Sequence, residues 1–227
     1  MRAGQRGRLL RNDGGKFAEV GREAGINDRG MSLSATWWDH NGDGWPDLYL
    51  ANDFLGPDRL YENQKDGTFR DVAPEVLPQV PWDSMGSDVG DINNDGREDF
   101  IATDMAGSTH YKAKLAMGDM SKFAWFLESG TPRQYMRNAV YLNTGQGRKM
   151  EIAQQLGLDA SDWTWSPKFG DLDCDGWLDI FITNGMTADW FNSDSRRHSD
   201  LGSSTPYTEL EPHRDLNLAL RPSLIPI

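Results

Sequence analysis

Three acidic segments of nine residues recur along the chain with one pattern, D-x-[ND]-x-D-G-x-x-D. They read DHNGDGWPD over residues 39–47 (loop 1), DINNDGRED over 91–99 (loop 2) and DLDCDGWLD over 171–179 (loop 3). Carboxylates this close together repel one another unless a cation or many donors lie among them. Oxygen-bearing side chains at positions 1, 3 and 5, with a glycine at position 6 that permits a sharp turn, can converge on one ion. The pattern therefore predicts three metal-binding loops.

The donor atoms favour calcium. They are hard oxygens, with no imidazole or thiolate at a ligand position, which suits calcium and disfavours zinc or copper. We expect about three calcium sites, each with side chains from positions 1, 3, 5 and 9 and the backbone carbonyl of position 7. The expected ligands are Asp39, Asn41, Asp43, Trp45 and Asp47 in loop 1, Asp91, Asn93, Asp95, Arg97 and Asp99 in loop 2, and Asp171, Asp173, Asp175, Trp177 and Asp179 in loop 3.

The EF-hand and the plain surface turn both fit these loops less well. The EF-hand places a bidentate Glu at position 12, where this chain has Leu50, Ala102 and Ile182. Asp, Asn and Gly also mark ordinary surface turns. Three copies in phase, each closed by an Asp at position 9, favour ion sites over turns alone.

A second motif alternates with the acidic loops and indicates the strands that hold them. The segments LLRNDGGKFAEV, LYENQKDGTFRDV and VYLNTGQGRKMEI each read as a strand, an Asn, a turn with glycine and another strand. One repeat is then strand, acidic loop, strand, connection, strand, Gly turn, strand. In the first full repeat we expect strands near 33–38, 47–52, 59–63 and 68–72. Four strands joined by tight turns form one blade of a β-propeller.

The predicted fold is all-β, a partial β-propeller of four-stranded antiparallel blades with two loop or helical insertions. Closed propellers have about four to eight blades, so we expect a fragment of a larger propeller. We also expect Trp82, Trp163 and Trp165 to pack between blades. The expected organisation is a single domain over 1–227, with a half blade (1–30), a blade (31–83), a blade (84–160) with an insertion at 107–137, and a truncated blade (161–227) with an insertion at 186–214.

The acidic repeat followed by LYLAND resembles the FG-GAP or VCBS repeat known from integrin α-subunit propellers. The segments GSTHYKAKLAMGDM, PRQYMRNAVYLNTGQG and ITNGMTADWFNSD resemble bacterial relatives of cartilage acidic protein, the group associated with ASPIC/UnbV sequences. The resemblance implies a seven-bladed propeller with calcium in its hairpin loops, in an exported or cell-surface protein. It implies no known reaction.

Composition restricts the partners. A net charge of −12 argues against binding to nucleic acid or an anionic membrane surface. No apolar run approaches the roughly 20 residues that cross a bilayer. The first residues, MRAGQRGRLLRN, carry arginines without an apolar segment behind them, so we recognise no signal peptide in this chain. We expect the full-length protein to be secreted, periplasmic or at the cell surface, with the rest of the propeller or another chain beside this one.

Two function classes remain open. The favoured one is a binding or adhesion module for a protein or a glycan, with His110, Tyr111, Trp125, Trp190 and Phe191 of the insertions as candidate ligand-binding residues. A plainer alternative for the insertions is that they cover a sheet edge. The other class is a polysaccharide lyase or hydrolase, because fold does not settle function. Common catalytic motifs are absent from the sequence. The only candidate catalytic residues are Asp53, Asp104, His110 and Glu128.

Overall fold

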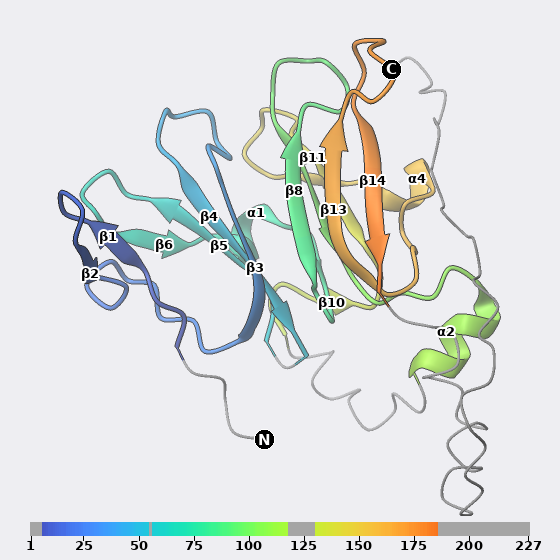
Figure 1. The fold of residues 1–227 in the computed structure, drawn as a ribbon, viewed down its shortest axis with the longest axis horizontal. Coiled ribbons are helices and arrows are strands. Elements are labelled where there is room, and N and C mark those ends of the chain that lie inside the picture. Colours follow the sequence, from blue (N-terminus) through green and yellow to red (C-terminus); the bar gives the residue numbers. More distant parts are fainter. Residues whose placement is uncertain (1–5, 55, 118–129, 186–227) are drawn as a thin grey trace, which may run out of the picture.

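The structure is a computed structural model that describes residues 6–54, 56–117 and 130–185. This part of the chain is mostly β, with small sheets that lie side by side across the molecule (Figure 1). The strands are β1 (Leu10–Asn12), β2 (Phe17–Glu19), β3 (Met31–Trp38), β4 (Asp47–Asp53), β5 (Arg59–Asn63), β6 (Phe69–Asp71), β7 (Val80–Pro81), β8 (Gly86–Gly90), β9 (Asp99–Thr103), β10 (Gln134–Tyr135), β11 (Ala139–Leu142), β12 (Met150–Glu151), β13 (Thr164–Gly170) and β14 (Asp179–Asn184). The helices are α1 (Ala73–Val76), α2 (His110–Met117) and α4 (Ala153–Leu156).

Two sheets have four strands, in the orders β3-β4-β5-β6 and β8-β9-β11-β12, and β13 pairs with β14 in a third. The four strands expected in the first full repeat are confirmed to within about two residues. The strand after loop 1 forms because LYLA combines aromatic and apolar residues, and all four are buried as a central strand requires. Among the described residues, the third sheet has only the two strands that flank loop 3.

One pairing departs from the expected antiparallel pattern. Strands β7 and β10 pair in parallel, with Val80 opposite Gln134 and Pro81 opposite Tyr135. The pair joins the connection between the first two sheets to the far end of the 107–137 insertion. A parallel pair is possible because a long connection separates its strands in sequence. The far end of the insertion, at Gln134–Tyr135, therefore pairs with the connection between the first two sheets.

The largest apolar core lies between the first and second sheets. Phe100 is its centre: its ring lies 4.4 Å from Tyr49, 4.9 Å from Tyr141 and 5.0 Å from Trp38, measured between centroids. A second cluster packs Ile26 against the first sheet, and a third packs Ile180 of β14 against the second sheet. Each sheet thus shares a core with the next one along the chain, and this packing holds neighbouring acidic loops at constant positions.

The expectation that three tryptophans are buried is wrong for one of them. Trp82 is buried, with 5% of its surface exposed, whereas Trp165 on β13 is 46% exposed. Trp163 is partly buried. Trp165 lies on β13 beside the fully buried Thr164, and its side chain points to the exposed face of that strand. In the described ranges, no helix is long and apolar enough to cross a bilayer.

Candidate metal centre

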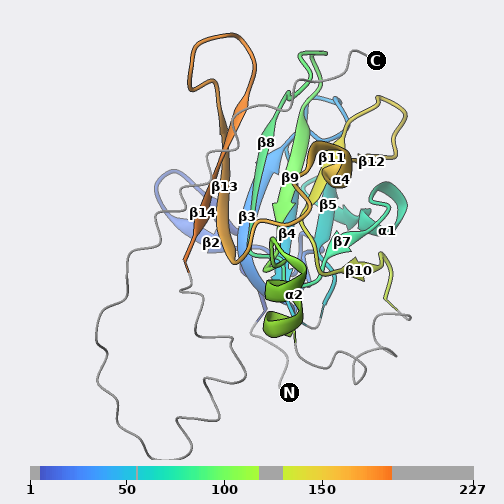
Figure 2. The same cartoon turned by 90° about the vertical axis from the view of Figure 1, so that its right-hand side faces the viewer.

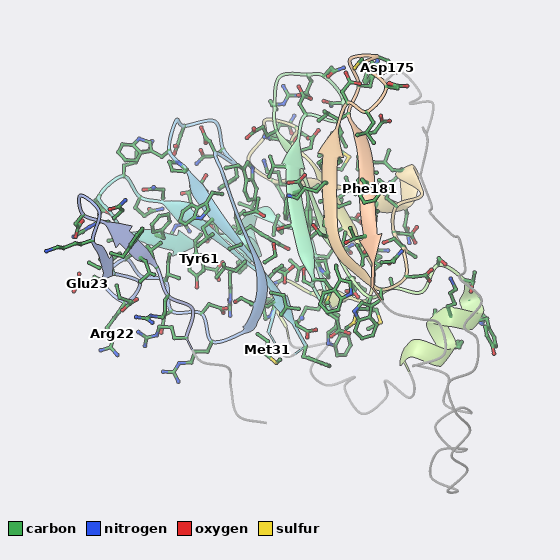
Figure 3. All side chains as sticks on the ribbon, viewed as in Figure 1. Arg22, Glu23, Met31, Tyr61, Asp175 and Phe181 are labelled. Carbon is green, nitrogen blue, oxygen red and sulfur yellow. The ribbon has the colours of Figure 1, made fainter. Side chains whose placement is uncertain are left out.

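The three acidic loops occupy equivalent places in the fold. Loop 1 joins β3 to β4, loop 2 joins β8 to β9 and loop 3 joins β13 to β14. Two views at right angles show all three at the same end of the molecule, the upper end, with α2 at the opposite end (Figures 1 and 2). Asp175 lies near the tip of loop 3 (Figure 3).

The carboxylate at position 1 organises each loop. In all three loops it accepts a hydrogen bond from the backbone amide of position 5 at 3.0 Å. It also accepts the amide of position 6 at 2.7, 2.8 and 2.9 Å in loops 1, 2 and 3. The same contacts at the same distances show that the three segments adopt one conformation. These bonds also offset the repulsion among the acids, because amide donors stabilise a charged carboxylate.

Positions 3 and 5 continue the pattern. The position 5 carboxylate accepts the amide of position 7 at 3.0, 2.9 and 2.9 Å in loops 1 to 3. In loops 1 and 2, position 3 is an Asn whose amide group donates to that same carboxylate, at 3.1 and 3.0 Å. The glycine at position 6 has φ of 85°, 82° and 86° in the three loops. This is the left-handed region that favours glycine, and it explains that part of the motif.

Position 9 has a structural role in loops 1 and 2. Asp47 and Asp99 are buried, and each accepts two backbone amides. Asp47 accepts His40 N at 3.0 Å and Asn63 N at 2.8 Å. Asp99 accepts Ile92 N at 3.2 Å and Asn143 N at 2.7 Å, and burial raises its pKa to about 6. The closing aspartate therefore ties each of loops 1 and 2 to the Gly turn of its own sheet.

Loop 3 brings three carboxylates together. One oxygen each from Asp171, Asp173 and Asp179 lie within 4.8 Å of one another, so this group could hold a metal ion. Asp171 and Asp173 are exposed and Asp179 is partly buried. The donors are all carboxylate oxygens, the ligand type that calcium prefers. Loop 3 also has an Asp at position 3, where the other two loops have Asn41 and Asn93.

Loops 1 and 2 have basic side chains at their position 5 carboxylates. Lys65 Nζ lies 3.2 Å from Asp43 Oδ2, and the Arg97 guanidinium pairs with Asp95. Burial acts to raise the pKa of Asp43, but hydrogen bonds from Lys65 and Asn41 leave it below its ordinary value. These two side chains show that the fold places a positive charge beside the predicted cation positions.

A third basic residue lies buried between loops 1 and 2. Lys149 is 7% exposed, and its ammonium donates to His40 O at 2.7 Å. Burial lowers the pKa of Lys149 to about 8, against the opposing effect of Asp99 and Asp47. Sequence reasoning missed Lys149, and it missed the Asn63 and Asn143 amides that bind position 9. The available signal was the Asn that recurs in the second motif, whose place beside the acidic loop becomes clear only in the folded chain.

The other candidate residues lie elsewhere. His110 and Tyr111 are exposed on α2, far from the acidic loops (Figure 1). Trp125, Trp190, Phe191 and Glu128 fall outside the described residues. Asp104 is fully buried and accepts the amides of Trp82 at 2.7 Å and Asp83 at 3.1 Å.

Asp104 belongs to a small acidic group with Asp83, which is also buried, and Asp53, which is partly buried. Burial and then the Asp83 carboxylate raise the pKa of Asp104 to about 8. Burial and then the Asp53 carboxylate raise the pKa of Asp83 to about 7. Burial also raises the pKa of Asp53. Backbone amides thus hold the Asp104 carboxyl inside the fold, and this environment indicates a structural role.

Comparison with known proteins agrees with this repeated geometry. A family model described as an FG-GAP-like repeat matches residues 39–102 and 124–182, which include all three acidic loops. No curated protein matches the chain. Domains of FG-GAP repeats are generally binding modules. The unit of strand, acidic loop and strand recurs with one hydrogen-bond pattern in every copy. Together with the matched residues, this recurrence shows that the chain belongs to the FG-GAP-like repeat family.

Proposed function

We propose that this chain is part of a β-propeller whose acidic loops bind calcium, and that it serves as an extracellular binding module for a protein or a glycan. The observation that carries the proposal is the shared loop geometry. Three loops at one end of consecutive sheets have the same hydrogen bonds, and in loop 3 three carboxylate oxygens lie within 4.8 Å. We expect one calcium ion in each loop, held by positions 1, 3, 5, 7 and 9.

The propeller arrangement is supported by how the sheets pack. The first strands of the three sheets, β3, β8 and β13, are neighbours: Thr36 and Ser87 share a hydrogen bond of 2.7 Å, and Lys168 Nζ lies 2.8 Å from Asp88. Strands that repeat in order around an axis are the arrangement of propeller blades. The motifs in residues 107–147 and 182–194 further support a place in the group related to cartilage acidic protein, which fits an exported protein.

In the proposed propeller, calcium has a structural role, because it stabilises the loops that bind it. Ligands from one loop become crosslinked when they share an ion, so binding lowers the entropy of the loop and neutralises its carboxylates. The opposite end, with α2, is then free to present ligand-binding residues such as Tyr111, which is 67% exposed. An exposed aromatic side chain on an insertion suits recognition of a protein or a sugar.

The first test measures calcium directly. Metal-free protein is titrated with calcium by isothermal calorimetry, and about three ions should bind, with Kd of about 10⁻⁴ to 10⁻³ M as in other extracellular modules. Magnesium should bind poorly because it requires a tighter octahedral site. Folded, metal-free protein that takes up no calcium would refute the calcium part of the proposal.

The second test concerns the ligand. Calcium-loaded protein is applied to arrays of glycans and of extracellular matrix proteins, and Tyr111→Ala is compared with the parent chain. We expect retention on one class of probe and a loss of retention in Tyr111→Ala with no change in calcium stoichiometry. Turnover of a polysaccharide without stable binding would instead support the enzyme alternative, for which the described residues offer no specific observation.

A further inference from the structure

Two strands at opposite ends of the row of sheets each have an edge with no partner strand among the described residues. There, β1 pairs only with β2, and β14 pairs only with β13. The two pairs lie far apart, with β1 and β2 beyond the first sheet and β13 and β14 beyond the second (Figure 1). An open edge presents a row of amides and carbonyls with which another strand can pair.

The two open pairs are different halves of the same repeat. β13 and β14 flank an acidic loop, as β3 and β4 do in the first sheet. β1 and β2 instead flank a Gly turn of the second motif, as β5 and β6 do. In both four-stranded sheets, the strand after the acidic loop pairs antiparallel with the strand before the Gly turn. The open edge of β14 therefore matches the open edge of β1 by strand type.

The asparagine at each Gly turn shows how these edges would meet. Asn63 and Asn143 donate their backbone amides to the position 9 aspartate of their own sheet, at 2.8 and 2.7 Å. Their side-chain amides donate to the carbonyl of position 8, at 3.1 and 3.4 Å. Asn12 has the equivalent turn, because its Oδ1 also accepts a backbone amide of the turn, at 2.7 Å. The matching acceptors in loop 3 are Leu178 O and the Asp179 carboxylate.

A partly covered apolar surface lies beside β14. Ile152 and Leu156, which follow β12, belong to the cluster that packs against β14, yet they are only partly buried. Val72 and Val76 follow β6 in the same way and are buried, in a core that includes Tyr141 of β11. β11 is a strand before a Gly turn, the strand type that would pair with β14. A strand of this type at the β14 edge would therefore complete the core.

We propose that β14 of one copy of this chain pairs with β1 of a second copy, head to tail, and that two copies close into one ring of sheets. The register of the complete sheets places Leu10 opposite Ile180 and Leu9 opposite Phe181. Leu10, which is 48% exposed, then covers the partly buried residues beside α4. Phe181, which is 39% exposed, then faces the first sheet of the second copy.

A second copy fits as the partner because this chain carries both halves of the sheet. Each copy has two four-stranded sheets and a two-stranded half at each end, so two copies would have six complete sheets. Closed propellers have roughly four to eight blades, and head-to-tail contacts of this kind can close a ring. Charge also favours the contact, since Arg8 and Arg11 lie at the β1 edge and loop 3 beside β14 is acidic. The inference rests on the propeller arrangement of the proposed function, and it needs no bound ion.

The mass of the chain in solution is the first measurement. Size-exclusion chromatography with light scattering, on residues 1–227 in calcium-containing buffer, should give about twice the chain mass of 25.5 kDa. The dimer should dissociate on dilution into a monomer, because its two junctions are non-covalent. A monomer at every concentration, or an open series of larger assemblies, would overturn the closed dimer.

Single-cysteine variants test which strands meet. In a Cys174→Ser background, Leu9→Cys and Phe181→Cys are prepared separately, mixed, allowed to exchange subunits and oxidised. A disulfide between two chains should form in the mixture, because residues directly opposite on paired strands have neighbouring Cβ atoms. Neither variant alone should crosslink, because head-to-tail pairing never brings equivalent strands together. Thr183→Cys in place of Phe181→Cys is the matched control, two residues further along β14 and out of register, and it should crosslink far less.

A charged side chain at the junction should separate the copies. Leu10→Asp places a carboxylate opposite Ile180, so the dissociation constant of the dimer should rise at least about tenfold. Met150→Asp is the matched control: Met150 on β12 is 51% exposed, and its equivalent in the first sheet, Arg70, is 50% exposed although the second sheet packs beside it.

The outcomes separate the inference from the proposed function. Equal dimerisation of Leu10→Asp and Met150→Asp, or a crosslink in Leu9→Cys alone, would overturn the head-to-tail pairing. Calcium titration of the same protein does not depend on these results, so the calcium sites would then stand or fall on their own test.

Discussion

At the scale of the residue, each loop aspartate has a separate task. Position 1 holds the amides of the loop, position 5 accepts the amide of position 7, and position 9 in loops 1 and 2 is buried and bound to two amides. The sequence pattern treats all four acidic positions as ligands alike. Burial separates them, because a carboxylate removed from water has to be satisfied by donors whether or not an ion is present.

Asp99→Asn tests the structural task of position 9. The amide group of Asn has one acceptor oxygen, so either Ile92 N or Asn143 N would face an NH₂ group. We expect a loss of about 1–3 kcal/mol in the free energy of unfolding, with and without calcium. Urea denaturation of both forms measures it. An effect seen only in calcium would show that Asp99 serves the ion and not the fold.

The buried acidic group makes stability depend on pH. Asp83 and Asp104 have pKa values of about 7 and about 8 in the folded state, above the ordinary value of 3.8. The folded state therefore holds protons that the unfolded state has released, and stability falls as pH rises from about 4 to about 8. In Asp83→Asn this fall should be smaller, by on the order of 3 kcal/mol over that range. Parallel stability–pH curves for the variant and the parent chain would contradict the assignment.

At the scale of the element, neighbouring sheets approach closely where glycine allows it. A Cβ on Gly86 of β8 would lie 2.5 Å from Trp165 O and 2.9 Å from Pro167 Cδ of β13. Similarly, a Cβ on Gly90 would lie 2.7 Å from Leu178 Cδ1. The first strands of the second and third sheets therefore pack with almost no space between their backbones. This contact sets the distance between loops 2 and 3, which Asn94 Nδ2 also bridges with a 2.9 Å bond to Gly176 O.

Gly86→Ala should separate the second and third sheets. The new methyl group meets backbone atoms of β13, which cannot rotate away as a side chain can, so we expect a loss of about 1–3 kcal/mol. Gly170→Ala is the matched control, because its Cβ would only meet Leu172 Cδ2 at 3.7 Å, an ordinary contact. Thermal melting of both variants measures the difference. Equal melting temperatures would show that β8 and β13 do not pack in this way.

At the scale of the whole molecule, the proposed calcium sites would change the net charge. The chain has a net charge of −12, and three calcium ions would add six positive charges and bring it to −6. Each ion that binds the folded state alone stabilises it by RT ln(1 + [L]/Kd). If the proposed calcium sites are present, the acidic loops connect the stability of the chain to the free calcium concentration.

A chelator should therefore destabilise the whole chain. At free calcium ten times Kd, each filled loop contributes about 1.4 kcal/mol, so three loops contribute about 4 kcal/mol. Urea denaturation in calcium and in chelator measures this difference, and Asp43→Ala, Asp95→Ala and Asp175→Ala should each remove about a third of it. Denaturation curves that coincide in calcium and in chelator would show that the loops are ordinary Asp-Gly turns that bind no calcium.

The repeat, the four strands of the first full unit and the loops that join them can all be predicted from the amino-acid sequence. These features are local: turn geometry needs Gly and Asp at set positions, and strands need apolar runs between turns. Other features become visible in the folded chain alone: which acids are buried, that Lys65, Arg97 and Lys149 lie at the acidic loops, and that Asn63 and Asn143 hold position 9. Arg97 lies two positions from Asp95, whereas the contacts of Asn63, Asn143 and Lys149 join residues 16, 44 and 109 positions apart. Strand pairing within a sheet and packing between sheets create these distant contacts, and the recurring Asn of the second motif is the signal in the sequence for two of them.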